Sequence, residues 1–173
     1  MVTTKQYTFQ NVTGNHTISA EFENMIDVNL CITTGQVGWC KIRYKVGSSS
    51  TWTNITSPTV AGTTVQVPVG GSITVEAYDI TTGKVFTQWV NAEPSLEIDT
   101  NPATFSELYD DTEITVVLST ATYTITATAG TGGSISPSGS VSVTHGNSQT
   151  FTVTASNGYK IKQILVDGSP IQL

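Results

Sequence analysis

Residues 65–92 read VQVPVGGSITVEAYDITTGKVFTQWVNA, and residues 141–168 repeat their pattern without a gap as VSVTHGNSQTFTVTASNGYKIKQILVDG. At this offset of 76 residues apolar positions meet apolar positions, as where Trp89 meets Leu165. Self-similarity at a fixed offset is typical of proteins built from repeated structural modules. The chain therefore predicts two related modules, one in the middle and one at the C-terminal end.

The composition indicates what these modules are made of. Thr, Val and Ile number 31, 18 and 14 among the 173 residues. β-Branched side chains lose rotamer freedom in a helix and pack well on a pleated sheet, so an all-β fold of two small, sandwich-like modules is expected. Short alternating runs between turn signals predict strands at 26–33, 39–46, 63–69, 72–78, 85–90, 113–119, 122–128, 140–143, 150–155 and 159–166.

The charge of the chain argues against two classes of partner. Seven Lys and Arg stand against thirteen Asp and Glu, which gives a net charge of −6. Nucleic acids and anionic lipids are bound by clustered basic residues, and here the basic residues are scattered. We expect no nucleic-acid partner and no membrane insertion. The abundance of Thr, Ser, Gly and Asn predicts an extracellular or cell-surface protein whose export signal is missing from the sequence.

A second self-alignment lays residues 7–23 on residues 103–119, at an offset of 96. In the central repeat this closing segment follows the strands at 65–92, whereas the C-terminal repeat would carry its own copy near 179–195, beyond Leu173. The copy stands at the N-terminus instead. We therefore expect three parts: a donor strand segment (1–23), a central domain (24–120) and an incomplete C-terminal domain (121–173).

The expected donor and acceptor side chains are apolar. The donor side chains are Tyr7, Phe9, Val12, Ile18, Ala20 and Phe22, and the acceptor side chains are Tyr123, Ile125, Phe151, Val153, Ile161 and Leu165. Open strand edges and apolar clefts are covered or used in natural proteins. The leading hypothesis is a structural subunit that donates its strand pair to the next copy of itself, forming a head-to-tail extracellular filament. The alternatives are one period of a tandem-repeat stalk or adhesin, acting as a spacer or as a glycan- or partner-binding module, and a monomer closed in cis.

The C-terminal repeat also carries a family resemblance. The run ATYTITATAGTGGSISPSG at 121–139, the segments QTFTVT at 149–154 and GYKI at 158–161, and the ending YTFQNVTGNHTI at 7–18 resemble the divergent internalin-type B-repeat of bacterial and archaeal surface proteins. The central repeat, 26–119, resembles it more loosely. The resemblance implies small β-rich modules, often compared to a β-grasp, in surface stalks and adhesins, with no catalytic residues to transfer.

The two cysteines stand close in sequence. If Gly35 and Gln36 are the central residues of a two-residue hairpin turn, Cys31 faces Cys40 as a non-hydrogen-bonded pair, about 4.5 Å apart at Cα, which a disulfide accepts. We expect a cross-strand disulfide. The alternatives are two reduced cysteines that act as small hydrophobic residues, or half of a metal site.

No group of residues predicts enzymatic chemistry. His16 and His145 lie in Thr-, Asn- and Gly-rich turns, away from a nucleophile or a carboxylate in a catalytic order. The acidic stretch at 93–113 offers oxygen ligands for Ca²⁺, but its spacing matches no known calcium loop. We expect no enzyme activity, no cofactor and no metal.

Three tryptophans and three sequons complete the inventory. Trp89 is expected in the core, while Trp52 is expected to be exposed, where it could contact a surface glycan. Possible glycosylation sites are the N-x-Thr sequons at Asn11, Asn15 and Asn54.

Overall fold

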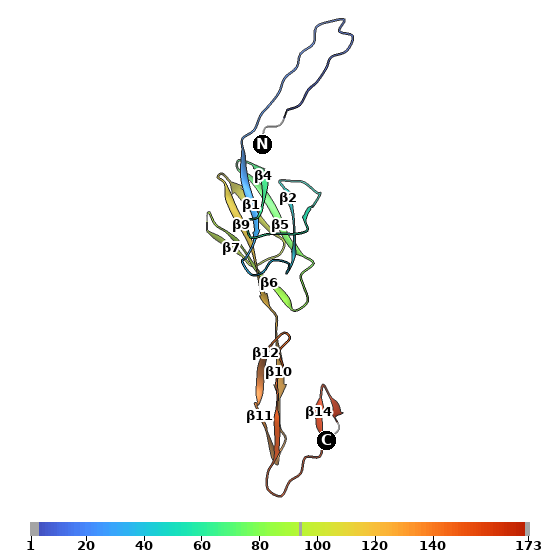
Figure 1. Ribbon diagram of the computed structural model, residues 1–173, viewed down its shortest axis with the longest axis vertical. Coiled ribbons are helices and arrows are strands. Elements are labelled where there is room, and N and C mark those ends of the chain that lie inside the picture. The colour runs from blue at the N-terminus through green and yellow to red at the C-terminus, as the bar shows by residue number, and fades with distance from the viewer. Residues whose placement is uncertain (1–3, 94, 172–173) are drawn as a thin grey trace.

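The computed structural model describes residues 4–93 and 95–171, so residues 1–3 and 172–173 of the two expected outer segments lie outside the described part. Every regular element in the described part is a β-strand, which confirms the all-β prediction. We call residues 4–24 the arm, 25–120 the central module and 121–171 the C-terminal module. The arm and the C-terminal module lie at opposite ends of the central module (Figure 1).

The central module is a sandwich of two sheets. The first sheet has the order β4 (Thr63–Pro68), β1 (Met25–Ile32), β9 (Thr112–Thr120), β6 (Lys84–Asn91) and β7 (Leu96–Ile98). The second has the order β3 (Thr53–Ile55), β2 (Lys41–Val46), β5 (Gly71–Tyr78) and β8 (Ala103–Leu108). Strand β9 is the centre of the first sheet, parallel to β1 and antiparallel to β6. Strand β8 pairs with β5 at an edge of the second sheet.

Side chains from both sheets form one core. Alternate residues of the strands face inward, and Ile42, Trp89 and Phe105 are among the largest fully buried side chains. Burying each such side chain contributes about 1.5–3 kcal/mol. Trp89 is 0% exposed, as expected, and its Nε1 donates a hydrogen bond of 3.3 Å to Asn101 Oδ1.

The prediction of a disulfide hairpin is wrong. The chain does turn at Gly35, which has a φ of 82°, but the turn is centred on Thr34 and Gly35 instead of Gly35 and Gln36, because the backbone N–H of Gln36 donates to the carbonyl of Thr33. A second turn at Gly38, with a φ of 85°, then sends the chain across to the other sheet. Strand β1 pairs with β4 and β9, and β2 pairs with β3 and β5. Cys40 faces the shared core, while Cys31 lies between two core residues of β1 and points to the opposite face of the sheet. Both cysteines are free.

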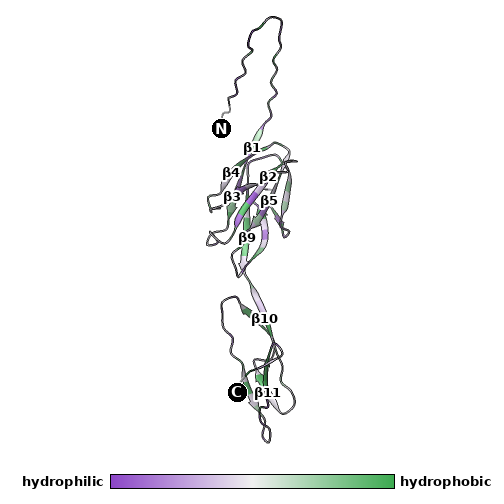
Figure 2. Ribbon diagram, turned by 90° about the vertical axis from the view of Figure 1, so that its right-hand side faces the viewer, coloured by the Kyte–Doolittle hydropathy of each residue, from purple (hydrophilic) through white to green (hydrophobic). Residues whose placement is uncertain are grey.

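The C-terminal module consists of three separate two-stranded sheets. These pair β10 (Thr122–Ala127) with β12 (Gly139–Thr144), β11 (Gly133–Ser136) with β13 (Thr152–Ala155), and β14 (Ile164–Val166) with β15 (Ser169–Ile171). Strand β9 continues through Ala121 into β10. The strands of the C-terminal module contain apolar residues, green in Figure 2, as do the strands of the sandwich. Among the described residues, none belongs to a helix long and apolar enough to cross a membrane.

Candidate assembly site

Strands β10 and β12 reproduce β1 and β4 in the same register. In the central module β1 pairs antiparallel with β4, and in the C-terminal module β10 pairs antiparallel with β12. The equivalent pairs are Ile26–Val67 with Tyr123–Val143, and Val28–Val65 with Ile125–Val141. The sequence repeat at an offset of 76 relates Val67 to Val143 and Val65 to Val141. The structure extends the repeat to their strand partners, so that Ile26 corresponds to Tyr123 and Val28 to Ile125.

The other two sheets have counterparts as well. Ile42 of β2 lies opposite Ala77 of β5, and Ile135 of β11 lies opposite Val153 of β13, at the repeat offset from Ala77. Strand β14 lies at the repeat position of β6. Strand β6 is followed by its antiparallel partner β7, and β14 is followed by its antiparallel partner β15. Six of the nine strands of the central module thus have counterparts, whereas residues 121–171 contain no counterpart of β3, β8 or β9.

The missing counterpart of β9 explains why the C-terminal module is divided. In the central module β9 lies between β1 and β6 and joins them into one sheet. Their counterparts, β10 and β14, belong to two different sheets. A strand inserted between them would complete a five-stranded sheet in the order of the central one.

Apart from the buried Ala127, the inward positions of the C-terminal module are exposed or half-buried. Val28 is 0% exposed, whereas its counterpart Ile125 is 41% exposed. The pattern extends to other predicted acceptor residues: Tyr123, Ile161 and Leu165 are exposed, and Phe151 and Val153 are only half-buried. Ile135, absent from the predicted set, belongs with them; its signal was a short alternation within a Gly-, Ser- and Pro-rich stretch.

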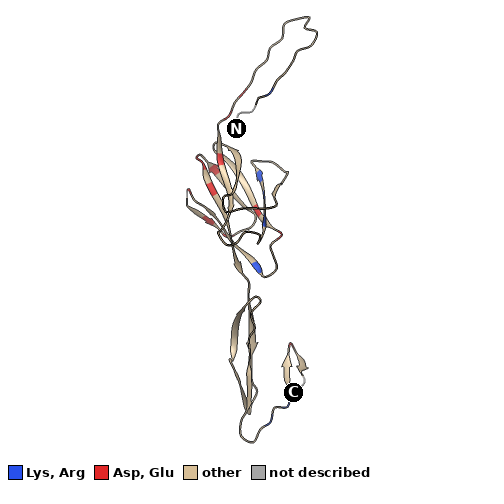
Figure 3. Ribbon diagram, viewed as in Figure 1, with Lys and Arg blue, Asp and Glu red and all other residues tan. Residues whose placement is uncertain are grey.

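The open strand edges carry no charge. None of the strands β10 to β15 contains Lys, Arg, Asp or Glu. Figure 3 shows the acidic residues gathered on the central module instead. Natural proteins use charged side chains to protect a free edge from pairing with another chain. These edges lack that protection, which favours a strand partner.

The arm exposes the predicted donor side chains. It is extended and leaves Ile18 70% and Phe22 94% exposed. Tyr7 and His16 each contact the ring of Phe9, at centroid distances of 4.9 and 5.0 Å. The predicted donor residues therefore come together on an arm that covers none of the acceptor positions of its own chain, since those lie at the far end of the molecule (Figure 1).

Two backbone features relate the arm to β8 and β9. Asn11 has a φ of 49° and its aligned residue Glu107 a φ of 57°, a left-handed conformation that is uncommon in residues other than glycine. At the end of the arm, Asn24 accepts a hydrogen bond of 3.0 Å from the backbone of Val69. At the end of β9, the carbonyl of Ala121 accepts a hydrogen bond of 2.8 Å from the backbone N–H of His145. His145 is the repeat counterpart of Val69. The arm therefore enters β1 as β9 enters β10.

The two thiols are unsuited to reaction. Burial, with the Glu113 carboxylate as the second cause, raises the pKa of Cys31 to about 12. Burial raises the pKa of Cys40 to about 11. Both side chains remain protonated at neutral pH, and a thiol reacts as the thiolate.

The remaining polar candidates lie apart from this interface. Trp52 is half-buried rather than exposed as expected, and the guanidinium of Arg43 lies 4.7 Å from the centre of its ring. The three sequon residues Asn11, Asn15 and Asn54 are exposed. A glycan partner and glycosylation both stay predictions.

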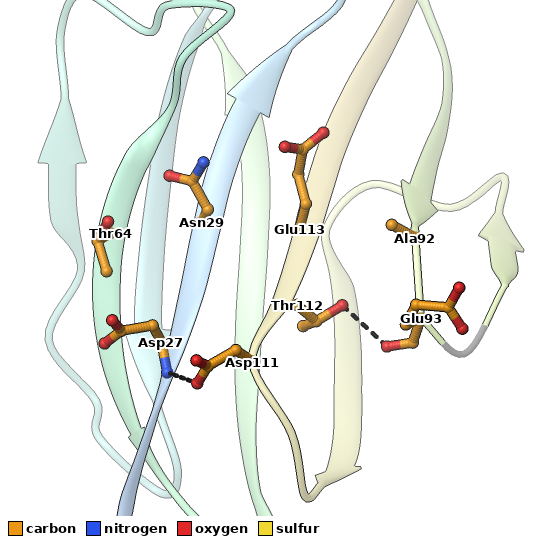
Figure 4. A pocket seen from close by; sticks show the side chains of 8 residues that line it. All are labelled: Asp27, Asn29, Thr64, Ala92, Glu93, Asp111, Thr112 and Glu113. Atoms are coloured by element: carbon orange, nitrogen blue, oxygen red, sulfur yellow. Dashed lines mark hydrogen bonds between the residues drawn. The ribbon is translucent and has the colours of Figure 1, made fainter.

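A shallow depression on the first sheet gathers part of the acidic stretch (Figure 4). The backbone N–H of Asp27 donates to Asp111 Oδ1 at 2.8 Å, and the Thr112 hydroxyl donates to the Glu93 carbonyl at 2.8 Å. Within the described ranges, no three His, Cys, Asp or Glu side chains are placed to hold a metal ion. His16 lies on the arm and His145 on the C-terminal module, so the two imidazoles do not come together.

Comparisons of the chain with protein-family models, curated proteins and solved structures return no match. The B-repeat resemblance thus stays a prediction, and the case for function rests on the geometry above.

Proposed function

We propose that this protein is the structural subunit of an extracellular filament, assembled head to tail by donation of the arm to the C-terminal module of the next copy. One observation carries the proposal. The C-terminal module reproduces six of the nine strands of the central module, and two of the three that it lacks, β8 and β9, share their sequence pattern with the arm.

The burial of the aligned residues supports the match. The arm aligns with β8 and β9, whose side chains at the donor positions are Ala103, Phe105, Leu108, Ile114, Val116 and Leu118; all six are buried in the central module. The donor residues are exposed in the free arm. Inserting them into an equivalent core would remove several aromatic and aliphatic side chains from water, at about 1.5–3 kcal/mol for each large one.

The position of the two halves supports a polymer. The arm and the C-terminal module lie at opposite ends of an elongated chain (Figure 1). A contact between two different surfaces does not close on itself unless the rotation happens to complete a ring, so it propagates as a fibre. An extracellular location accords with the Thr- and Ser-rich, weakly charged composition.

The experiment is to compare the purified chain under native and denaturing conditions. Negative-stain microscopy is expected to show filaments, and boiling in SDS is expected to reduce them to a band at the chain mass of 18.3 kDa. The variant Phe9→Asp, Ile18→Asp is expected to stop assembly, because it places carboxylates at two buried positions. The matched control is Gln10→Asp, Thr17→Asp, whose aligned residues Ser106 and Glu113 are exposed.

Filaments that persist in the Phe9→Asp, Ile18→Asp variant contradict the proposal. So does a compact native monomer, which favours closure in cis or one period of a tandem-repeat stalk.

A further inference from the structure

We infer that the donated arm enters the middle of the acceptor sheet in one register, with residues 16–24 as the central strand between β10 and β14 of the neighbouring copy. This inference rests on the proposed strand donation and adds its position and register. It excludes simple addition of the arm to an outer edge of the C-terminal module.

The β14 side of the register follows from the pairing of β6 with β9. In the central module Trp89 lies opposite Val116, and Val90 lies opposite Thr115. The repeat offsets carry these pairs to Leu165 opposite Ala20 and Val166 opposite Ser19. Leu165 and Ala20 then point into the core, while Val166 and Ser19 point to the outer face, as their counterparts do.

The β10 side follows from the parallel pairing of β1 with β9. Asn29 lies beside Glu113 and Leu30 beside Ile114. The corresponding neighbours in the joint are Thr126 beside Thr17 and Ala127 beside Ile18. Because residues 16–24 then meet a strand on each side, both open edges are paired by one segment.

The first half of the arm would occupy the position of β8. Phe105 lies opposite Ile73 of β5, and the hydroxyls of Thr104 and Thr74 are 3.0 Å apart. At the repeat offsets, residues 7–12 lie along the segment that leads into β13, and Thr8 meets Thr150. The left-handed conformation of Glu107 in β8 is already present at the aligned residue Asn11 of the free arm.

The test uses chains with single added cysteines, which are mixed, assembled and oxidised. Mixing Ser19→Cys chains with Val166→Cys chains is expected to give a disulfide-linked dimer on non-reducing gels. Mixing Thr17→Cys with Thr126→Cys chains is expected to do the same. The shifted pair, Glu21→Cys with Val166→Cys, is expected to give none, because diagonal neighbours lie about 7–8 Å apart, beyond disulfide reach.

Two controls bracket the result. The double variants Val90→Cys, Thr115→Cys and Asn29→Cys, Glu113→Cys carry the equivalent pairs inside the central module. Both are made with Cys31→Ser, because Cys31 lies beside Thr115 and contacts Glu113, and each must form its internal disulfide. The native chain, whose two cysteines are buried, must give no dimer.

Each outcome has a distinct meaning. Dimers from both expected mixtures support the central position. Filaments that link through only one side, through the shifted pair or through neither overturn the register while leaving strand donation intact. An internal link in a Ser19→Cys, Val166→Cys double variant, without dimers in the mixture, establishes cis closure and overturns both proposals, as does the absence of filaments.

Discussion

Replacing Ile18 by alanine is expected to weaken the joint between subunits and to leave each subunit folded. Ile18 is 70% exposed in the free chain, whereas its aligned residue Ile114 is 0% exposed. Truncating a buried isoleucine to alanine costs about 2–5 kcal/mol, and truncating an exposed one costs less than about 0.5 kcal/mol. A loss of about 2–4 kcal/mol in the joint corresponds to a critical concentration for assembly that is about 30- to 700-fold higher.

The assay is sedimentation of filaments over a range of protein concentrations, with thermal unfolding of the central module followed by tryptophan fluorescence. Thr17→Ala is the matched control and should leave the critical concentration near the native value. Ile114→Ala should lower the unfolding temperature instead. A critical concentration for Ile18→Ala within about threefold of native, which is under 0.7 kcal/mol, would refute the reasoning.

Three further predictions concern chemistry. First, Cys31 and Cys40 should resist thiol reagents in the native protein at pH 8 and react after unfolding. Because their folded pKa values of about 12 and 11 exceed the ordinary 9.0, the folded state keeps protons that the unfolded thiols release; stability should therefore fall as pH rises above 9, as measured by urea unfolding at each pH. Second, Asn101→Ala should destabilise the central module by about 2–4 kcal/mol in urea titrations, since its amide makes hydrogen bonds of 2.9 and 2.8 Å to the backbone of β5 and accepts one of 3.3 Å from the buried indole; an unchanged midpoint would contradict this. Third, the aligned positions of the buried Thr112–Asn91 hydrogen bond are His16 and Asp167, so these two side chains should lie side by side in the joint, and a double-mutant cycle with His16→Ala and Asp167→Ala should show coupling in the critical concentration. Independent effects of the two changes would count against that pairing.

The strands of the central module are largely predictable, because the pattern of Val, Ile and Thr along its sequence follows the alternation of buried and exposed positions. The expected strands at 63–69 and 72–78 match β4 and β5 within a residue. The path of the chain after the turn at Gly35 is not predictable in this way. A local turn signal says that the chain reverses, but which sheet it then joins is decided by the packing of Ile42 into a core shared with distant strands.

The candidate site is predictable in its residues more than in its geometry. The self-alignment of residues 7–23 with residues 103–119 identifies Phe9 and Ile18 as predicted donor residues, because apolar positions match in the two segments while surface positions differ. They cannot reveal that the missing partner of the acceptor is a central strand, since the places of β1 and β6 on either side of β9 come from pairing between remote segments. Ile135 escapes notice because its strand has only four residues.

The parallel pairing of β1 and β9 has a mechanical consequence. In the proposed fibre, a tensile load would enter each subunit at the start of β1 and leave at the end of β9, where the chain continues through Ala121. These neighbours run in the same direction along the register from Val28–Thr112 to Ile32–Val116. Pulled at opposite ends, they must slide past each other, so the hydrogen bonds between them resist shear together instead of opening one at a time. The donated strand beside β10 would be loaded in the same manner, which makes every joint as resistant by geometry as the module it copies.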